Sequence, residues 1–169
     1  MPARRATQAE CLPLNAPSID ARARNVPRTG RQSSCSWHLK YMFALLSENG
    51  PCTVAADGVN TTPNPHSWTT NANVIWVDQP IGTGFSLGAT EDFDTSATEA
   101  GVHLRDFLQE WFKEHPKFAH HKFFITGESY AGHYVPALAT ALLKSTPTDI
   151  PINLQGITIG NGWTTPSHR

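Results

Sequence analysis

The sequence of 169 residues has little cysteine, no excess of charge of either sign and no long apolar run. Its three cysteines, Cys11, Cys35 and Cys52, are too few for a disulfide scaffold, and their odd number would leave one thiol unpaired in a secreted protein. No run approaches the roughly 20 apolar residues that a membrane-spanning helix needs, and residues 1–34 lack the apolar centre of a secretory signal. Since 13 Lys and Arg stand against 14 Asp and Glu, the formal charge of -1 gives no electrostatic reason to expect a nucleic acid or an anionic membrane as partner.

What remains is the composition of a globular protein. A hydrophobic share of 39% and a charged share of 16% are typical of a soluble protein with a core. Residues 1–34 are rich in Arg, Ser, Pro and Ala and show neither helical nor strand periodicity. We therefore assign residues 1–36 to a disordered or aberrant N-terminal segment and residues 37–169 to one α/β domain.

Apolar periodicity predicts alternating helices and strands in that domain. One helix is expected over 37–46, and another begins after the cap Ser96, with Glu99 three positions on, and ends at His115-Pro116. The other expected elements are a helix over 134–143 and strands over 73–78, 122–126 and 154–159. This alternation is typical of a mostly parallel sheet flanked by helices.

The strand over 122–126 runs directly into Gly127-Glu-Ser-Tyr-Ala-Gly132. In α/β-hydrolases the nucleophilic serine lies on such a tight strand-to-helix turn, where the residues two positions to each side must be very small. Gly127 and Ala131 occupy those positions around Ser129, and the first helical amides, near Tyr130, could stabilise an oxyanion. The alternative is that the glycines only shape a loop and that Ser129 caps a helix.

Six phrases resemble the serine carboxypeptidase family and stand in the order in which that family has them. They are Glu48-Asn-Gly-Pro-Cys52, Asn64-Pro-His-Ser-Trp68, Asn71-Ala-Asn-Val74, Asp78-Gln-Pro-Ile-Gly-Thr-Gly-Phe-Ser86, Gly127-Glu-Ser-Tyr-Ala-Gly-His-Tyr-Val-Pro136 and Ile159-Gly-Asn-Gly162. The resemblance implies a partial α/β-hydrolase fold that is incomplete at its C-terminal side. It also implies a serine-type carboxypeptidase, which releases C-terminal residues from peptides through an acyl-enzyme.

The resemblance assigns roles to single residues. Ser129 would be the nucleophile, and the backbone amide of Tyr130 would be one oxyanion donor. Glu128, protonated and hydrogen-bonded to Glu48, would bind the C-terminal carboxylate of the substrate, because two carboxyls close together in a pocket cannot both ionise. The alternative for this pair is an exposed loop charge and a capping carboxylate. The small residues that shape the turn would be Gly127, Ala131 and Gly132.

Two features of the family are missing from the sequence. The Gly-rich segment that supplies the second oxyanion donor is replaced by residues 28–36, of which only Cys35-Ser36 fits the family. The triad acid and histidine should follow the serine, and only Asp149 and His168 stand in that order. Both fall in loops, so we expect this chain to be a weak or inactive peptidase. The alternatives are a catalytically dead fragment or pseudoenzyme with residual peptide binding and an esterase or lipase of the same fold.

The other expectations concern partners and processing. Asn60-Thr-Thr62 is an acceptor triplet for N-glycosylation in a polar loop. The resemblance implies a secreted, vacuolar or lysosomal protein, although no signal peptide is visible, and a peptide or protein partner with a free C-terminus. No cofactor, metal, nucleic acid or membrane is expected.

Overall fold

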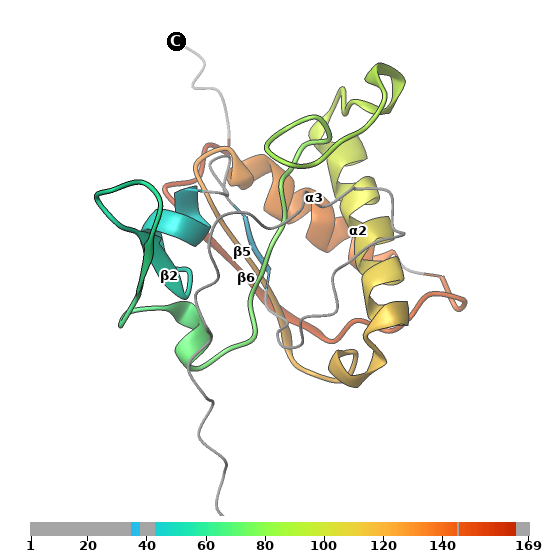
Figure 1. The fold of residues 1–169 in the computed structure, drawn as a ribbon. Helices are drawn as coiled ribbons and strands as arrows, with labels where there is room; N and C mark the ends of the chain where they lie inside the picture. Colours follow the sequence, from blue (N-terminus) through green and yellow to red (C-terminus); the bar gives the residue numbers. More distant parts are fainter. Residues whose placement is uncertain (1–34, 38–42, 145, 165–169) are drawn as a thin grey trace, which may run out of the picture.

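The central sheet contains four parallel strands in the part of the chain that the structure describes (Figure 1). The computed structural model describes residues 35–37, 43–144 and 146–164. The order of the strands is β4-β1-β5-β6, so β6 is an edge strand of the described sheet. Their bounds are β1, Cys35–Trp37, β4, Ile75–Trp76, β5, Phe123–Glu128, and β6, Leu154–Gly160.

Two helices, α2 (Ala97–Glu114) and α3 (Ala131–Leu143), pack together beside β5 and β6. The N-terminus of α2 is capped by Ser96, whose hydroxyl accepts a hydrogen bond from the Glu99 amide at 3.2 Å. A Cβ atom added to Gly101 of α2 would lie 2.6 Å from a backbone carbon of Ala137 in α3. The close contact between the two helices therefore requires glycine at this position.

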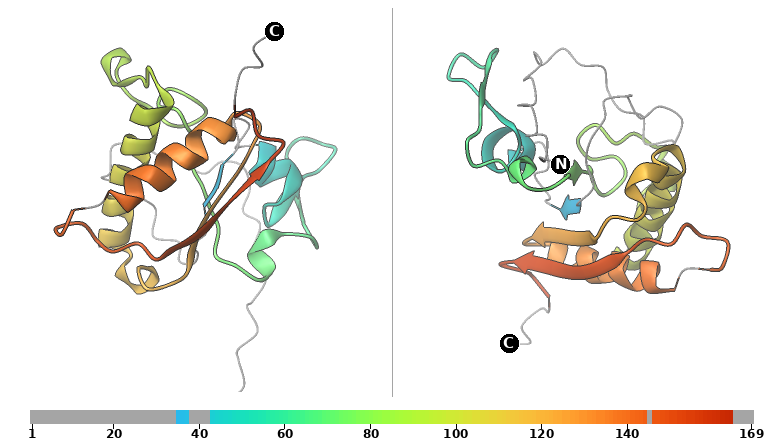
Figure 2. Two further views of the ribbon diagram at one scale, coloured as in Figure 1. Left: turned by 180° about the vertical axis from the view of Figure 1, so that it is seen from behind. Right: turned by 90° about the horizontal axis from the view of Figure 1, so that it is seen from below.

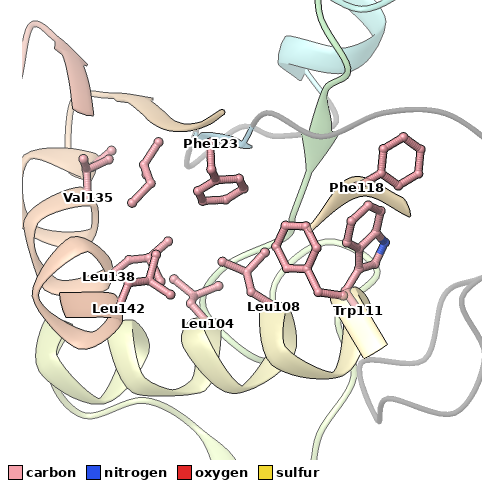
Figure 3. Close-up of a cluster of buried hydrophobic side chains, with 11 residues drawn as sticks. Leu104, Leu108, Trp111, Phe118, Phe123, Val135, Leu138 and Leu142 are labelled. Atoms are coloured by element: carbon pink, nitrogen blue, oxygen red, sulfur yellow. The ribbon is translucent and has the colours of Figure 1, made fainter. Parts of the chain in front are cut away.

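The hydrophobic core lies between these helices and one face of the sheet (Figure 3). Phe123 and Ile125 of β5 point into it and are buried, and Leu104 and Leu108 of α2 and Leu138 of α3 cover them. Because side chains alternate along a strand, Phe124, Thr126 and Glu128 belong to the opposite face. That opposite face is where the candidate site lies.

A segment that includes a small antiparallel hairpin lies on the other side of the strands from α2 and α3 (Figures 1 and 2). It begins with a helical turn of π type, η1 (Ala44–Glu48). The C-cap of this turn is Asn49, just before Gly50-Pro51. The hairpin strands are β2 (Cys52–Val54) and β3 (Thr61–Pro63), and a short 3-10 turn, η2 (Trp68–Thr70), follows. Two further 3-10 turns are η3 (Thr90–Asp92) and η4 (Pro116–Phe118).

The structure confirms the expected α/β alternation and corrects its N-terminal part. The helix expected from Trp37 is wrong at its start, because Trp37 belongs to β1 and pairs with Gly127 of β5. Cys35 and Ser36, which we assigned to the N-terminal segment, pair with β4 and β5 and are part of the sheet. The expected disorder over 1–34 falls outside the described residues. Across the described ranges, no helix has the length and apolar character required to cross a membrane.

Candidate functional site

Ser129 lies at the tight turn between β5 and α3. Its φ of 56° is left-handed, a conformation that costs a residue other than glycine about 1–3 kcal/mol and that is concentrated at functional sites. Three backbone hydrogen bonds hold it there: the Ser129 N–H donates to Gly160 O at 3.0 Å, and the Ser129 carbonyl accepts from the amides of Gly132 at 3.0 Å and Trp163 at 2.8 Å. The side chain is exposed at the end of the strand. The predicted sharp turn is therefore present.

The residues around the turn are as small as the predicted geometry demands. A Cβ atom added to Gly132 would lie 2.6 Å from the carbonyl oxygen of Trp163, so no side chain fits between α3 and the chain after β6. Ala131 is buried in the core cluster, where its methyl group is accommodated. Alanine in place of the more usual glycine is thus compatible with this turn.

The backbone amide of Tyr130 is available at the start of α3. Within the described residues, its N–H donates to no protein acceptor, as is usual in the first turn of a helix. The Tyr130 ring lies 4.8 Å from the ring of His133 and 5.7 Å from that of Trp163. The pKa of the neighbouring Tyr134 is raised, chiefly by burial and also by Tyr130 and Asp94. A free amide next to Ser129 lies where one donor of an oxyanion hole is expected.

A pocket of about 440 Å³ lies between the sheet and the η1–η2 segment. Glu48, at the end of η1, and Glu128, at the end of β5, both line it, although 80 residues separate them in the sequence. The register of β5 and β6 brings Thr126 beside Thr158 and Glu128 beside Gly160. The other lining residues are Asn49, His66, Trp68 and Gly127. The structure thus brings the two predicted carboxyls into one pocket, and one of them, Glu128, directly precedes Ser129 in the chain.

Asparagine side chains fix the wall of the pocket that carries Glu48. The side-chain amide of Asn64 donates to Glu48 O and to Gly50 O, each at 2.9 Å, and its oxygen accepts from the His66 amide at 2.9 Å. Asn49 is buried, and its side-chain oxygen accepts from the Trp76 indole nitrogen at 3.0 Å. Sequence reasoning missed Asn49, Asn64 and His66, although all three lie within the quoted phrases.

The candidate triad partners are not brought to Ser129 in the described part of the chain. There, no side chain forms a hydrogen bond with Ser129 Oγ. Asp149 precedes β6, at the other end of the sheet, and its carboxylate accepts from the Thr146 amide at 2.6 Å. His168 lies outside the described residues, as does the segment 28–34 that replaces the Gly-rich loop. The ring of His133 packs against those of Tyr130 and Trp163.

Two further expectations fall on the hairpin. Asn60 is exposed at the turn before β3, and its side-chain amide donates to Asp57 at 2.6 Å. The pKa of Asp57 is lowered by hydrogen bonds, first from the backbone amides of Asn60 and Val59. Cys52, at the start of β2, is disulfide-bonded. Among the described residues, no group of three or more His, Cys, Asp or Glu could hold a metal ion.

Known proteins of one family resemble this chain. Residues 40–169 match the family described as serine carboxypeptidase. The chain is 50% identical over 127 residues to Serine carboxypeptidase-like 47 of Arabidopsis thaliana, and the matched region covers 73% of this chain and 25% of that protein. It is 39% identical over 128 residues to Pheromone-processing carboxypeptidase KEX1 of Yarrowia lipolytica, and the matched region covers 76% of this chain and 20% of that protein.

A solved structure, that of the prohormone-processing carboxypeptidase KEX1(delta)p from Saccharomyces cerevisiae, superposes with a TM-score of 0.69 at 32% identity. The match covers 79% of this chain and 31% of that chain. The chain spans about a quarter of the length of the first curated relatives that it matches. The fold is accordingly part of an α/β-hydrolase fold, and the chain belongs to the serine carboxypeptidase family.

Proposed function

We propose that this chain carries the acyl-forming half of a serine-type carboxypeptidase site, with Ser129 as the nucleophile. The observation that supports this most is the left-handed Ser129, held by three backbone hydrogen bonds, beside a pocket that Glu48 and Glu128 both line. A merely capping serine would have no need of the strained conformation. An exposed loop charge and a capping carboxylate would have no need to share a pocket.

The chemistry assigned to each group follows from its position. Ser129 Oγ attacks the carbonyl carbon of the last peptide bond, and the Tyr130 N–H donates to the oxygen that becomes negative. As the C–N bond breaks, the Ser129 proton must pass to the leaving nitrogen, and this transfer needs a base that the described residues around Ser129 do not supply. Glu128 and Glu48 share a proton and donate it in a hydrogen bond to the C-terminal carboxylate of the substrate. The substrate class is therefore peptides with a free C-terminus.

An active-site phosphonate probe tests the nucleophile. The folded chain should be labelled at Ser129, as read by mass spectrometry of the digested protein, and Ser129→Ala should remove the label. Ser47, which is exposed at the end of η1, provides the matched control, because Ser47→Ala should leave labelling unchanged. Labelling that persists in Ser129→Ala would contradict the assignment.

A second candidate, peptide binding without turnover, is favoured by one observation. In the described residues no side chain is hydrogen-bonded to Ser129 Oγ, and removing the base of a triad costs several orders of magnitude in rate while binding persists. A folded sample that resists the phosphonate, yet binds a peptide with a free C-terminus more tightly than its amide, would identify this function.

The proposed compartment rests on two features of the hairpin. The disulfide at Cys52 is typical of oxidising compartments, and the exposed Asn60 triplet would accept a glycan there. We assign the protein to the secretory or vacuolar route. Expression in a secreting eukaryotic host should add mass that peptide-N-glycosidase removes, and Asn60→Gln should abolish that addition.

A further inference from the structure

The side chain of Asn64 connects two parts of the pocket wall. Its amide group donates two hydrogen bonds, to Glu48 O and Gly50 O, and thus bridges the carbonyls of the two residues that flank Asn49. Its oxygen accepts the amide of His66, a further lining residue. All three bonds are 2.9 Å long, so the asparagine uses both of its amide hydrogens and its acceptor within the wall of one pocket.

We infer that Asn64 is a positioning residue that holds Glu48 in the place where it meets the C-terminal carboxylate of a peptide. The inference rests on the proposed function. Asn64 lines no part of the pocket itself, so it acts through the backbone of Glu48.

A second set of bonds holds the same segment from the other side. The carbonyl of Asn49 accepts from the Trp68 amide at 3.0 Å and from the Ser67 hydroxyl at 3.3 Å. The two segments that carry Glu48 and Trp68 are thereby joined along adjacent peptide groups. Asn64 is the side chain that reaches the carbonyl of Glu48, while the N–H of the same peptide group, that of Asn49, donates to Ala44 O at 2.9 Å. Loss of Asn64 would therefore leave this peptide group held on its amide side and remove the side-chain donor from its carbonyl.

Small movements of Glu48 matter because of the chemistry assigned to it. A hydrogen bond to a carboxylate depends steeply on geometry, since it weakens as the distance and the angle between donor and acceptor leave their preferred range. Displacements of about 1 Å in a site can cost about a hundredfold in rate. A side chain that fixes the peptide unit of Glu48 therefore controls how well the pair receives a carboxylate.

The test measures binding in the non-turning-over Ser129→Ala chain. The ligands are N-acetyl-Phe-Leu with a free carboxylate and the same dipeptide as its amide, titrated by calorimetry at two pH values, about 5 and 8. Asn64→Asp keeps the size and the acceptor for His66 but replaces both donors. We expect about a tenfold loss of affinity for the free acid, no change for the amide, and a weaker preference for low pH, because Glu48 is then no longer held where it meets the carboxylate.

A double-mutant cycle shows whether Asn64 acts through Glu48. Glu48→Ala should lower the affinity for the free acid at least as much as Asn64→Asp, and the combined variant should lose no more than Glu48→Ala alone. The matched control is Thr53→Ala, which removes the hydroxyl contact with Thr62 in the adjoining hairpin and should leave both affinities unchanged.

Each outcome decides between the two proposals. If Ser129→Ala does not discriminate between acid and amide, the proposed function fails and the inference falls with it. If it discriminates and Asn64→Asp discriminates equally well, the inference alone is overturned. If Asn64→Asp does not fold, Asn64→Ala replaces it, and unfolding of both would show a structural role that overturns the inference.

Discussion

The two regions that meet at the pocket hold their functional residues by different means. The Ser129 turn is fixed by backbone groups: three main-chain hydrogen bonds and the absence of a side chain at Gly132. The Glu48 segment is fixed largely by side chains, with Asn49, Asn64 and Ser67 bonded to residues 14 to 27 positions away. A backbone-held turn depends on the size of the residues around it, whereas a side-chain-held segment depends on their chemistry.

The two regions are therefore vulnerable to different kinds of substitution. A substitution that adds one methyl group to the turn must push the backbone, and the backbone of a packed core yields little. A substitution in the Glu48 segment removes a donor or an acceptor and leaves its partner unsatisfied, at a cost of about 1–3 kcal/mol. Substitutions in the two regions should therefore differ in the size of their effects.

The largest effect is expected from Gly132→Ala. The new methyl carbon would lie 2.6 Å from Trp163 O, so the chain after β6 must shift, and we expect a loss of about 3 kcal/mol in the free energy of unfolding. Chemical denaturation with fluorescence detection measures it. Labelling of Ser129 by the phosphonate should fall together with stability.

The matched control is Gly156→Ala on β6. There the added methyl carbon would meet only the Phe124 ring at 3.6 Å, which is ordinary contact, so stability should change little. Equal losses in the two variants would show that the tight contact at Gly132 is not what holds the Ser129 turn.

The same contrast explains what the sequence could predict. The helix α2, the strands β5 and β6 and the Ser129 turn follow from local patterns, since apolar spacing, the Ser96 cap and small residues act over a few positions. The left-handed residue could be expected because the Gly127–Gly132 phrase places small residues where that bend needs them. Family resemblance named Glu48 and Glu128, and their common pocket depends on the fold.

What the sequence could not predict depends on distant pairing. The three residues of β1 are too few for a periodic signal, and they form a strand because β4 and β5 lie on each side of them. The role of Asn64 follows from a contact across 16 residues, which a reading of neighbouring positions does not reveal. An asparagine next to proline is first read as a turn residue, and it is one here as well.

A smaller effect is expected from Asn49→Ala, in the side-chain-held region. The buried oxygen that accepts from the Trp76 indole is lost, and the N–H is left without this partner, so we expect a loss of about 1–2 kcal/mol in the free energy of unfolding. Asn49→Asp keeps an acceptor in the same place and should lose less. If Trp76→Phe combined with Asn49→Ala is no more stable than Asn49→Ala, the unsatisfied indole is not the cause.

The smallest effect is expected at the start of α2, where a side chain holds the backbone over only three positions. Ser96→Ala removes the acceptor of the Glu99 amide and should cost about 1 kcal/mol, as measured by thermal unfolding. Because this contact is local and exposed, the loss should leave peptide binding at the pocket unchanged, unlike substitution of Asn64. A change in carboxylate discrimination would show that the two sides of the sheet are coupled.

The pH dependence of that helix start sharpens the contrast, because its carboxylate is held by exposed groups. Hydrogen bonds from the Thr95 hydroxyl and then the Thr95 amide lower the pKa of Glu99 below its ordinary value of 4.5. A carboxyl whose pKa is lower in the folded state stabilises the fold above its unfolded pKa, and this contribution disappears as the pH falls through the lowered value. Between about pH 7 and pH 3, the melting temperature of Glu99→Gln should therefore fall less than that of the parent chain. The matched control is Glu91→Gln, which removes a charge outside α2 and should behave like the parent. A parent-like fall in Glu99→Gln would mean that other carboxylates dominate the acid response, with Glu48 and Glu128 in the pocket the next pair to replace.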